Sequence, residues 1–482
     1  MKTKLLITFL IFFAFFIHGV TQLDPDFGWH LRMGQVILSS GIPKTDPFSY
    51  SMPSYPFIDL SWLSGVILAW LYPKIGMIGL SFLAALITVL SLIITLSIKF
   101  KAGKLKNFYF WAGLLVLSSS AIFPFEAVRI QVISWLFLAI VLKIFLEQDY
   151  WEKRRFLLPG LFLLWANLHG SFLAGLVVLG IGILVRSWRI KNLKISDAMI
   201  LISSALLTLI NPYGLNLYGE VARTLWGSNL SGQIMEWMPA IFNFNLPFIA
   251  LIPVSVLSVW HYRKKYNLEI LVLFFGFLVA AIFSQRHIPL WIIICLPLPM
   301  NSFHYFALEI NRIKFGRERM KKMVIFCFFG CLFLFLTTFL LVLSSGLTEN
   351  NFYPAEAVKY LKNSLPEGQI FSEYGWGGYL IWKLPEKKVF IDGRMCTWPN
   401  IMKDNEAILT GKTNYQTVFQ QYGIKVVLWP KARQAGLLEQ FTGKILRIFK
   451  KEESFNLIRQ IEKDGWKKVY EDQVAAIYRL PI

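Results

Sequence analysis

Long hydrophobic runs, separated by short basic segments, dominate the first 346 residues of the chain. A helix needs about 20 mostly apolar residues to cross a bilayer, and eleven runs approach or reach that length. These runs cover residues 4–20, 75–98, 107–124, 127–147, 156–168, 170–186, 196–212, 245–260, 267–284, 288–307 and 322–346. The pattern predicts a transmembrane domain of about 11 helices over residues 1–346.

Three apolar segments allow more than one interpretation. The first run resembles a signal peptide but lacks a small-x-small cleavage site, so we expect an uncleaved membrane anchor. The stretch 62–72 is too short to cross a bilayer and is expected to be an interfacial helix on the outer face. Residues 156–186 could form two spans or one long helix.

Composition and charge support a membrane protein. Hydrophobic residues make up 55% of the chain and charged residues 16%, whereas about a quarter of a soluble domain is charged. This excludes a soluble multidomain enzyme and a disordered chain. The net charge of +20 does not indicate nucleic-acid binding, because most of the excess lies in short gaps between apolar runs, as topology signals do.

These charges also predict an orientation. With the N-terminus inside, the inner gaps hold 23 basic residues: Lys2, Lys4, Lys99, Lys101, Lys104, Lys106, Lys143, Lys153, Arg154, Arg155, Arg186, Arg189, Lys191, Lys194, Arg263, Lys264, Lys265, Arg312, Lys314, Arg317, Arg319, Lys321 and Lys322. The outer side holds six, which are Arg32, Lys44, Lys74, Arg129, Arg223 and Arg286. Since cytoplasmic loops are enriched in Lys and Arg, we expect an integral protein of a bacterial plasma (inner) membrane, with a cytoplasmic N-terminus.

Residues 347–482 are predicted to form a soluble, extracytoplasmic α/β domain. Strand and helix patterns alternate here, which favours a small, partly parallel sheet. The expected helices are 354–365, 375–384 and 453–465, and the expected strands are 368–373, 387–393, 422–430 and two within 466–480. The predicted fold class is therefore an α-helical polytopic membrane protein with a C-terminal α/β domain.

Polar and ionisable residues collect in the predicted outer loops, above all in the long first loop, 21–62. These residues are Asp24, Asp26, His30, Arg32, Arg129, Asn167, His169, Asn211, Tyr213, Gln285, Arg286 and His287. Ionisable groups at membrane ends are costly and suggest function. Because adjacent helices bring their outer turns together, we predict a polar cavity that opens to the outside.

Each of these residues also has a local structural explanation. Asp24 or Asp26 could cap a helix that begins near Phe27, and Arg129 and Arg286 could be snorkelling anchors. Turn formation could account for His169, His287, Asn211-Pro212-Tyr213-Gly214 and Asp46-Pro47. An Asp–Arg pair in a tight turn could account for Asp392-Gly393-Arg394.

The residue types nevertheless fit one kind of chemistry. A carboxylate at the outer surface can act as a general base on a hydroxyl or hold a divalent cation. Arginines bind phosphate through forked hydrogen bonds, and histidine could assist there. We therefore predict Asp26 and Asp24 as catalytic or metal-binding residues, and Arg129, Arg286 and His287 as ligands of a lipid phosphate. Neither a GxxxxGK[ST] motif nor a dinucleotide-binding fingerprint is present.

The first loop also carries a longer motif. It contains Asp24, Asp26, Trp29-His30-Leu31, Gly34, Gly41, Ile42-Pro43, Asp46-Pro47-Phe48-Ser49-Tyr50 and Trp62-Leu63. Short motifs follow at 129–131 (R-x-Q), 167–170 (N-L-H-G), 211–214 (N-P-Y-G), 286–287 (R-H) and 390–394 (F-I-D-G-R). With these residues the chain resembles GT-C membrane glycosyltransferases, and among them a bacterial branch similar to dolichyl-phosphate-mannose-protein mannosyltransferases (RgtA/B/C/D-like).

The resemblance implies transfer of a sugar from a polyprenyl-phosphate donor to a glycan, lipid or protein acceptor, with inversion and a first-loop aspartate as base. Asp26 is favoured over Asp24 because it leads directly into the Trp29-containing helix. The resemblance expects a bulky residue at position 28, where this chain has glycine. Apart from a possible divalent cation at Asp24 and Asp26, no cofactor is expected.

Other classes remain open on sequence alone. A transporter or flippase of lipid-linked sugars would favour charges at mid-membrane and broken helices, whereas the polar residues here crowd one face. An O-antigen ligase or polymerase would need a large late outer loop between spans. A non-catalytic membrane scaffold is the remaining alternative.

Overall fold

The structure is a computed structural model that describes residues 2–99, 107–226, 234–243, 245–310, 316–344, 346–398, 400–431 and 455–481. Five of the basic residues that were counted for orientation lie outside the described residues: Lys101, Lys104, Lys106, Arg312 and Lys314. The chain divides into two compact units. The first holds the described residues of 1–20, 75–225 and 229–344, and the second those of 21–74, 226–228 and 345–482.

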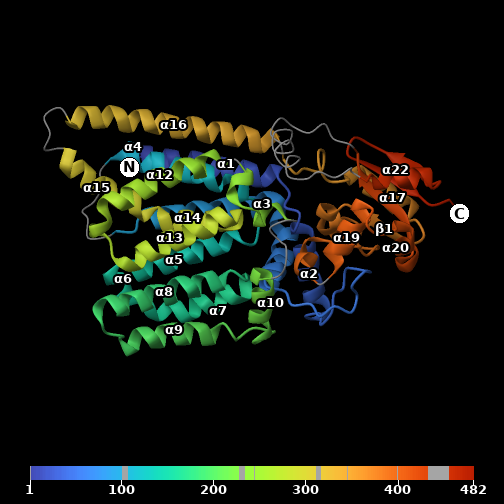
Figure 1. Ribbon diagram of the computed structural model, residues 1–482, viewed down its shortest axis with the longest axis horizontal. Coiled ribbons are helices and arrows are strands. Elements are labelled where there is room, and N and C mark those ends of the chain that lie inside the picture. The colour runs from blue at the N-terminus through green and yellow to red at the C-terminus, as the bar shows by residue number, and fades with distance from the viewer. Residues whose placement is uncertain are drawn as a thin grey trace. The chain divides into compact units, whose positions relative to one another are not determined.

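The first unit is helical. Its helices are α1 (Lys2–Thr21), the later part of α3 (Trp62–Leu96), α4 (Phe108–Ile122), α5 (Val132–Leu146), α6 (Gln148–Arg154), α7 (Leu158–Leu168), α8 (Phe172–Ile190), α9 (Ile195–Leu207), α10 (Asn216–Trp226), α12 (Leu246–Tyr262), α13 (Leu268–Phe283), α14 (Ile288–Cys295), α15 (Pro297–Ile310) and α16 (Gly316–Ser344). Short 3₁₀ turns lie at Phe123–Phe125, Arg155–Leu157, Met235–Trp237, Ala240–Asn243, Arg263–Lys265 and Gln285–His287. Figure 1 shows the long helices of this unit running side by side.

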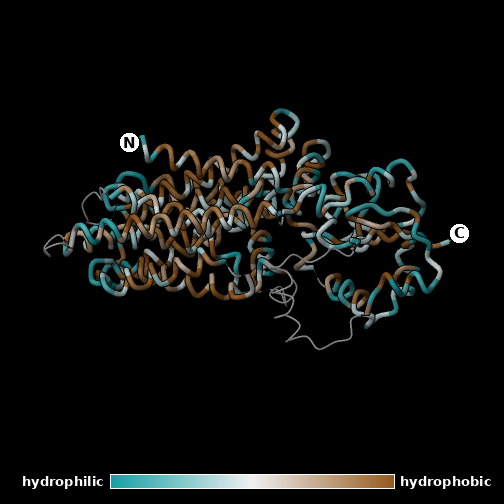
Figure 2. Tube along the Cα trace, turned by 90° about the horizontal axis from the view of Figure 1, so that it is seen from above, coloured by the Kyte–Doolittle hydropathy of each residue, from teal (hydrophilic) through white to brown (hydrophobic). Residues whose placement is uncertain are grey.

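Apolar residues cover these helices, as the hydropathy colouring in Figure 2 shows. Among the described residues, seven helical segments are long and apolar enough to cross a membrane: Lys2–Thr21, Trp62–Leu96, Phe108–Phe125, Phe172–Ile190, Leu246–Lys265, Gln285–Glu309 and Glu318–Ser344. Three shorter apolar helices are Val132–Leu146, Ile195–Leu207 and Leu268–Phe283. The polytopic helical membrane fold is confirmed, whereas the count of eleven spans is not. Residues 156–186 form two helices, α7 and α8, which separate at 169–171.

Helix α4 lies at the centre of the first unit. Every residue from Trp111 to Ile122 is buried, which is typical of a helix that is surrounded by others. It packs against α16, α12 and α14.

Helix α3 contains a break. Pro73 lies inside it, and Gly76 has φ 60° and ψ −168°, outside the helical region. A positive φ is open to glycine at little cost. The helical stretch before the break belongs to the second unit and the stretch after it to the first, so 62–72 is a separate helical segment, as the sequence predicted.

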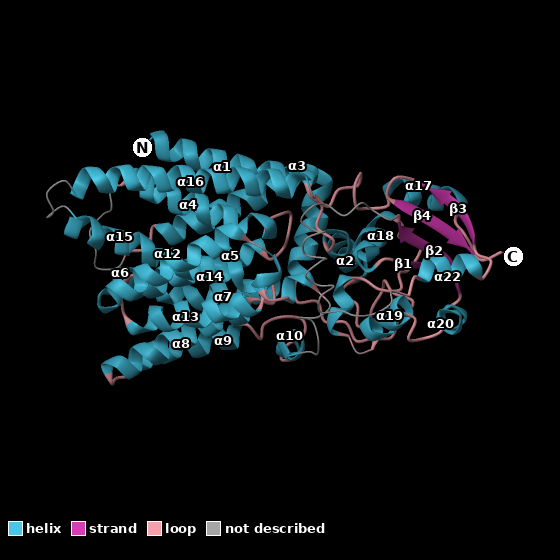
Figure 3. Cartoon of the chain, turned by 45° about the horizontal axis from the view of Figure 1, so that its top comes forward, coloured by secondary structure: helices cyan, strands magenta, loops and turns pink. Residues whose placement is uncertain are grey.

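The second unit is a small α/β structure. Its elements are α2 (Phe27–Ser40), the early part of α3, α17 (Ala355–Ser364), β1 (Gln369–Ser372), α18 (Gly377–Lys383), α19 (Ile401–Thr410), α20 (Tyr415–Tyr422), β2 (Ile424–Pro430), α22 (Leu457–Lys463), β3 (Lys467–Glu471) and β4 (Ala475–Arg479), with 3₁₀ turns at Tyr374–Trp376 and Gly393–Thr397. The strands lie in the order β1-β2-β4-β3 (Figure 3). β1 and β2 are parallel and the other pairs antiparallel. A partly parallel sheet is therefore confirmed.

One strand prediction is wrong. Residues 387–393 do not join the sheet, and Val389 makes an isolated parallel bridge to Ser49 of the first loop. Tyr50 N donates to Val389 O at 3.1 Å, and Val389 N donates to Phe48 O at 3.0 Å. The apolar sequence Val389-Phe390-Ile391 is buried, but its backbone pairs with the first loop instead of β1.

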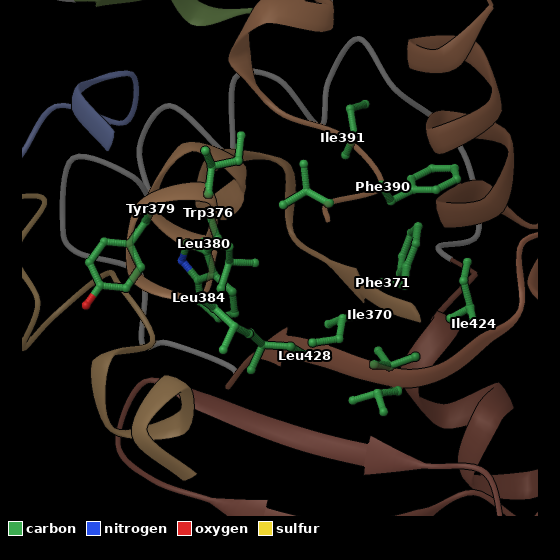
Figure 4. Close-up of a cluster of buried hydrophobic side chains, with 14 of the residues drawn as sticks. Ile370, Phe371, Trp376, Tyr379, Leu380, Leu384, Phe390, Ile391, Ile424 and Leu428 are labelled. Carbon is green, nitrogen blue, oxygen red and sulfur yellow. The ribbon is translucent and has the colours of Figure 1, made fainter. Parts of the chain in front are cut away.

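The first loop belongs to the core of the second unit. Phe48 and Phe57 lie in the hydrophobic cluster that contains Phe371, Phe390 and the other residues drawn in Figure 4. This loop was expected to be part of the transmembrane domain 1–346, with the soluble domain starting at 347. In the structure, residues 21–74 instead group with the C-terminal residues, because their aromatic side chains complete that core.

Candidate functional site

Two aspartates, Asp24 and Asp26, lie just before the first residue of α2. Asp26 is the N-cap residue, yet its side chain makes no capping hydrogen bond. Its Oδ1 instead accepts a hydrogen bond from Trp29 Nε1 at 2.9 Å. Asp24 is buried, and its Oδ1 accepts the backbone N–H of Asp26 at 2.9 Å. The carboxylate of Asp24 thus fixes the turn, while the half-buried carboxylate of Asp26 is oriented by an indole.

Glycines pack the C-terminal residues of the second unit closely around this start. A Cβ on Gly28 would stand 2.2 Å from Gly378 O, and a Cβ on Gly378 would stand 2.2 Å from Pro25 O. A Cβ on Gly393 would stand 2.1 Å from Asp26 Oδ1. Gly28 therefore allows α2 and α18 to pack backbone against backbone, which gives a physical reason for glycine where the resemblance expects a bulky residue.

Arg394 joins the first loop to the F-I-D-G-R motif. Its Nε and Nη2 donate to the two carboxylate oxygens of Asp392 at 2.8 and 2.6 Å, and its Nη1 donates to Asp46 Oδ1 at 2.5 Å. Burial lowers the pKa of Arg394, but the carboxylates of Asp392 and Asp46 outweigh it and raise that pKa above its ordinary value. The guanidinium lies among the rings of Phe48 and Phe57. The Asp–Arg pair expected for a tight turn is present, and it also anchors the first loop.

Another buried carboxylate of the first loop is that of Asp59. Asp59 Oδ1 accepts Ser61 Oγ at 2.9 Å, and Ser61 Oγ lies 3.5 Å from His30 Nδ1. Among the described residues Asp59 Oδ2 is buried without a hydrogen-bond partner. Burial raises the pKa of Asp59, against the lowering effects of Ser61 and of the charge on Arg394. His30 is thus connected to a buried carboxylate through a serine.

Arg32, predicted to lie in a substrate cavity, lines a cavity of about 200 Å³ in the second unit. Lys387 and Lys388 contribute to the same wall, beside Val36, Pro47, Phe48, Ile381 and Pro385. Arg32 Nη1 donates to Gln35 Oε1 at 2.9 Å. The cavity is therefore basic on one part of its lining and apolar on the rest.

In the first unit, one predicted phosphate ligand pairs with a carboxylate, and the charge of a second acts on it. Arg129 Nη2 donates to Glu236 Oε1, and the guanidinium of Arg286 lies 5.0 Å from the centre of the Trp237 ring. Burial raises the pKa of Glu236, but the charges of Arg129 and Arg286 outweigh it and lower that pKa below its ordinary value. Arg129 therefore contacts Glu236, and Arg286 lies near enough for its charge to act on the same carboxylate.

His169 lies in the turn between α7 and α8, where the charge on Arg286 acts on it. Its Nδ1 lies 3.1 Å from Ser134 Oγ and 2.8 Å from Ser171 Oγ, and accepts the backbone N–H of Ser171 at 3.2 Å. Burial, with a smaller effect of the charge on Arg286, lowers the pKa of His169 to about 3. With Nδ1 accepting the backbone N–H of Ser171, the neutral imidazole carries its proton on Nε2 and offers it as a donor.

Two other predicted residues also lie beside the Met235–Trp237 turn. Gln285 N donates to Met238 O at 3.0 Å, and the ring of His287 meets that of Trp237 edge to face. These contacts join the connection between α10 and α12 to the turn before α14.

The remaining predicted residues make turn contacts. Asn167 Nδ2 donates to Leu163 O and Ile210 O at 2.8 and 2.9 Å. Asn211 Oδ1 accepts the backbone N–H of Tyr213 at 2.8 Å. Asn167, Asn211 and Tyr213 thus lie at the ends of α7 and α9, where local structure accounts for the asparagine contacts.

Metal binding was predicted at Asp24 and Asp26. Within the part of the chain that the structure describes, no group of three or more His, Cys, Asp or Glu is placed to hold a metal ion. One oxygen of each aspartate accepts a hydrogen bond from the protein. A divalent cation here would have to take most of its ligands from water or substrate.

Sequence reasoning missed Glu236 and the bond from Trp29 to Asp26. Glu236 is the one acidic residue within 234–243, and a single acidic residue outside any motif does not indicate a functional site. The Trp29 bond had a signal, because a residue three positions after an N-cap lies over that cap on the first helical turn.

Comparison with known proteins gives structural neighbours only. No protein-family model matches the sequence, and no curated protein matches it. The fold is similar to that of ArnT from Cupriavidus metallidurans bound to undecaprenyl phosphate, with 10% identity, 99% of this chain and 98% of ArnT covered, and a TM-score of 0.50. ArnT in the apo state is 9% identical, with 99% of this chain and 97% of ArnT covered and a TM-score of 0.53.

A third solved structure has a related fold. The Archaeoglobus fulgidus oligosaccharyltransferase in the apo form is 11% identical, with 89% of this chain and 69% of that chain covered and a TM-score of 0.50. At these identities the likeness concerns the fold. Together with the apolar helices and the small C-terminal sheet, it shows that this chain has the fold of the GT-C-type membrane glycosyltransferases.

Proposed function

We propose that this protein is a membrane glycosyltransferase that moves a sugar from a polyprenyl-phosphate donor to an extracytoplasmic acceptor. The observation that carries the proposal is the likeness, over 99% of this chain, to the structure of ArnT bound to undecaprenyl phosphate. The excess of basic residues in the predicted inner gaps favours an extracytoplasmic second unit. The acceptor is a glycan, lipid or protein.

Asp26 is the proposed base. Its carboxylate does not cap α2, and its Oδ1 accepts a hydrogen bond from Trp29 Nε1, which orients the carboxylate. The acceptor oxygen gives its proton to Asp26 and forms a bond to the anomeric carbon from the side opposite the phosphate. The bond between that carbon and the phosphate oxygen breaks, and its electron pair leaves with the polyprenyl phosphate. The product therefore has inverted configuration.

Arg129 and Arg286 are the proposed ligands of the leaving phosphate. Both are cationic, both lie near Glu236, and guanidinium groups match phosphate oxygens with pairs of hydrogen bonds. His169 supports the proposal as a neutral donor beside Arg286. Negative charge grows on the phosphate as the sugar leaves, so these groups would stabilise the transition state more than the ground state.

Asp24 is proposed to position Asp26 through its bond to the Asp26 backbone. A divalent cation at Asp24 and Asp26 remains a prediction, and no step of the reaction above depends on it.

The test is a transfer assay. Purified protein is incubated with membranes that contain radiolabelled polyprenyl-phosphate sugars and with cell-envelope extract, and Asp26→Asn and Asp24→Asn are compared with the wild type. Asp404→Asn is the matched control, because Asp404 is an exposed aspartate of the same unit.

We expect the wild type and Asp404→Asn to move label from lipid to acceptor. Asp26→Asn should lose at least about 100-fold in rate, the low end of what a general base contributes. Label that stays on the lipid with the wild type, for every donor tried, would shift the interpretation to transport or scaffolding. Equal rates for Asp26→Asn and the wild type would remove Asp26 as the base.

A further inference from the structure

The two-arginine group of the first unit already holds a carboxylate. Arg129 Nη2 donates to Glu236 Oε1, with the arginine side chain 19% exposed and that of the glutamate 32% exposed. Both groups are partly open, so a ligand from outside can reach them. No ion pair of Arg286 is found among the described residues, where it lies over the ring of Trp237.

The backbone fixes Glu236 in this place. Gln285 N donates to Met238 O at 3.0 Å, so the connection that carries Glu236 and Trp237 is bound to the turn that carries Arg286. Ser284 Oγ also points to Glu236 O, at 3.5 Å. The backbone of Glu236 is therefore held next to the turn that carries Arg286, while its side chain pairs with Arg129.

The charges of these groups make Glu236 and a bound phosphate compete for Arg129. Two guanidinium groups and one carboxylate have a net charge of +1, whereas a phosphate monoester carries close to two negative charges at pH 7. If Glu236 stayed in contact with Arg129 while the phosphate bound, two anions would share the same donors and repel each other. The phosphate and the carboxylate would thus exclude each other at Arg129.

We infer that Glu236 is an internal counterion that holds Arg129 and Arg286 when no lipid phosphate is bound, and that it weakens binding of the released polyprenyl phosphate. This rests on the proposed function. Glu236 keeps the arginines oriented and lowers the affinity for the product lipid. It acts through the arginines and is a positioning residue.

The experiment measures binding of undecaprenyl phosphate to the full-length protein in nanodiscs. The variants are Glu236→Gln, Arg129→Gln and Glu220→Gln. Glu220 is the matched control, because it pairs with Arg223 three residues later in α10, at 2.7 Å. Glutamine at 236 keeps the size of the side chain and removes its charge.

We expect the dissociation constant of Glu236→Gln to fall by up to about fivefold, since a partly exposed ion pair is worth up to about 1 kcal/mol. Glu220→Gln should match the wild type, and Arg129→Gln should bind more weakly. The gain should shrink as salt is raised.

Two results with Glu236→Gln would overturn the inference. Weaker or unchanged binding by Glu236→Gln, with a melting temperature near that of the wild type, would show that the carboxylate does not compete. A large loss of melting temperature together with weaker binding would assign Glu236 a structural role. If the wild type binds no undecaprenyl phosphate at all, the proposed function fails as well, whereas binding by the wild type without a gain in Glu236→Gln leaves it standing.

Discussion

Replacing Arg394 with methionine tests whether the first loop depends on the C-terminal residues of the second unit. The side chain of Arg394 is 2% exposed and those of Asp46 and Asp392 are 0% exposed. Methionine keeps much of the apolar contact with the surrounding rings but leaves two buried carboxylates without their cation.

The expected loss is large. Removing one partner of a buried ion pair costs about 3–5 kcal/mol, and because one guanidinium serves two carboxylates here we expect the upper end, about 5 kcal/mol. For a unit of 150–250 residues, about 2–4 °C is lost for each kcal/mol, so the melting temperature should fall by about 10–20 °C.

Thermal unfolding of the detergent-purified protein measures this. Arg459→Met is the matched control, because Arg459 is exposed on α22 and should be within about 0.5 kcal/mol of the wild type. Adding Asp46→Asn and Asp392→Asn to Arg394→Met should recover part of the loss, since the unpaired charges are then gone. A melting temperature for Arg394→Met equal to that of Arg459→Met would refute the reasoning.

Three further predictions concern the surroundings of Asp26. Gly28→Ala should destabilise the protein by about 1–3 kcal/mol, because its Cβ would stand 2.2 Å from Gly378 O, while Gly276→Ala, which meets nothing within 4 Å, should not; equal melting temperatures would contradict this. Burial raises the pKa of Asp59 above its ordinary value of 3.8, so the folded wild type binds this proton more tightly than the unfolded chain and loses stability as pH rises through that range. Asp59→Asn has no such proton, so its melting temperature should rise relative to that of the wild type over the same range. A constant difference between the melting temperatures of the two proteins from pH 4 to 8 would argue against this. Trp29→Phe removes the donor to Asp26, so the transfer rate should fall, and a rate equal to that of the wild type would mean that this bond does not orient the Asp26 carboxylate for the reaction.

Much of the fold could be predicted from the sequence because hydropathy and helical periodicity are local signals. The apolar helices and the α/β character of the C-terminal residues follow from them. Residues 387–393 show the limit of such signals. A buried apolar run indicates a strand, but its partner is a loop more than 300 residues earlier.

The candidate site was predictable in its residue types and less so in its contacts. The outer turns contained Arg129, Arg286 and His169, and the structure places them in one group. Glu236 had no pattern around it, and Asp46 and Arg394 are 348 residues apart, so their pairing depends on tertiary structure. Glycine at 28 was unexpected because the opposing Gly378 backbone cannot be inferred from the α2 sequence.

The fate of the donor lipid tests the central claim most directly. Purified protein is given a panel of polyprenyl-phosphate sugars with envelope extract as acceptor, and mass spectrometry follows the lipid. The account predicts that one donor is converted to free polyprenyl monophosphate, with one sugar gained by an acceptor for each lipid released, by the wild type and Asp404→Asn but not by Asp26→Asn. Donor lipids that all stay intact with the wild type, or lipid released at the same rate by Asp26→Asn, would contradict it.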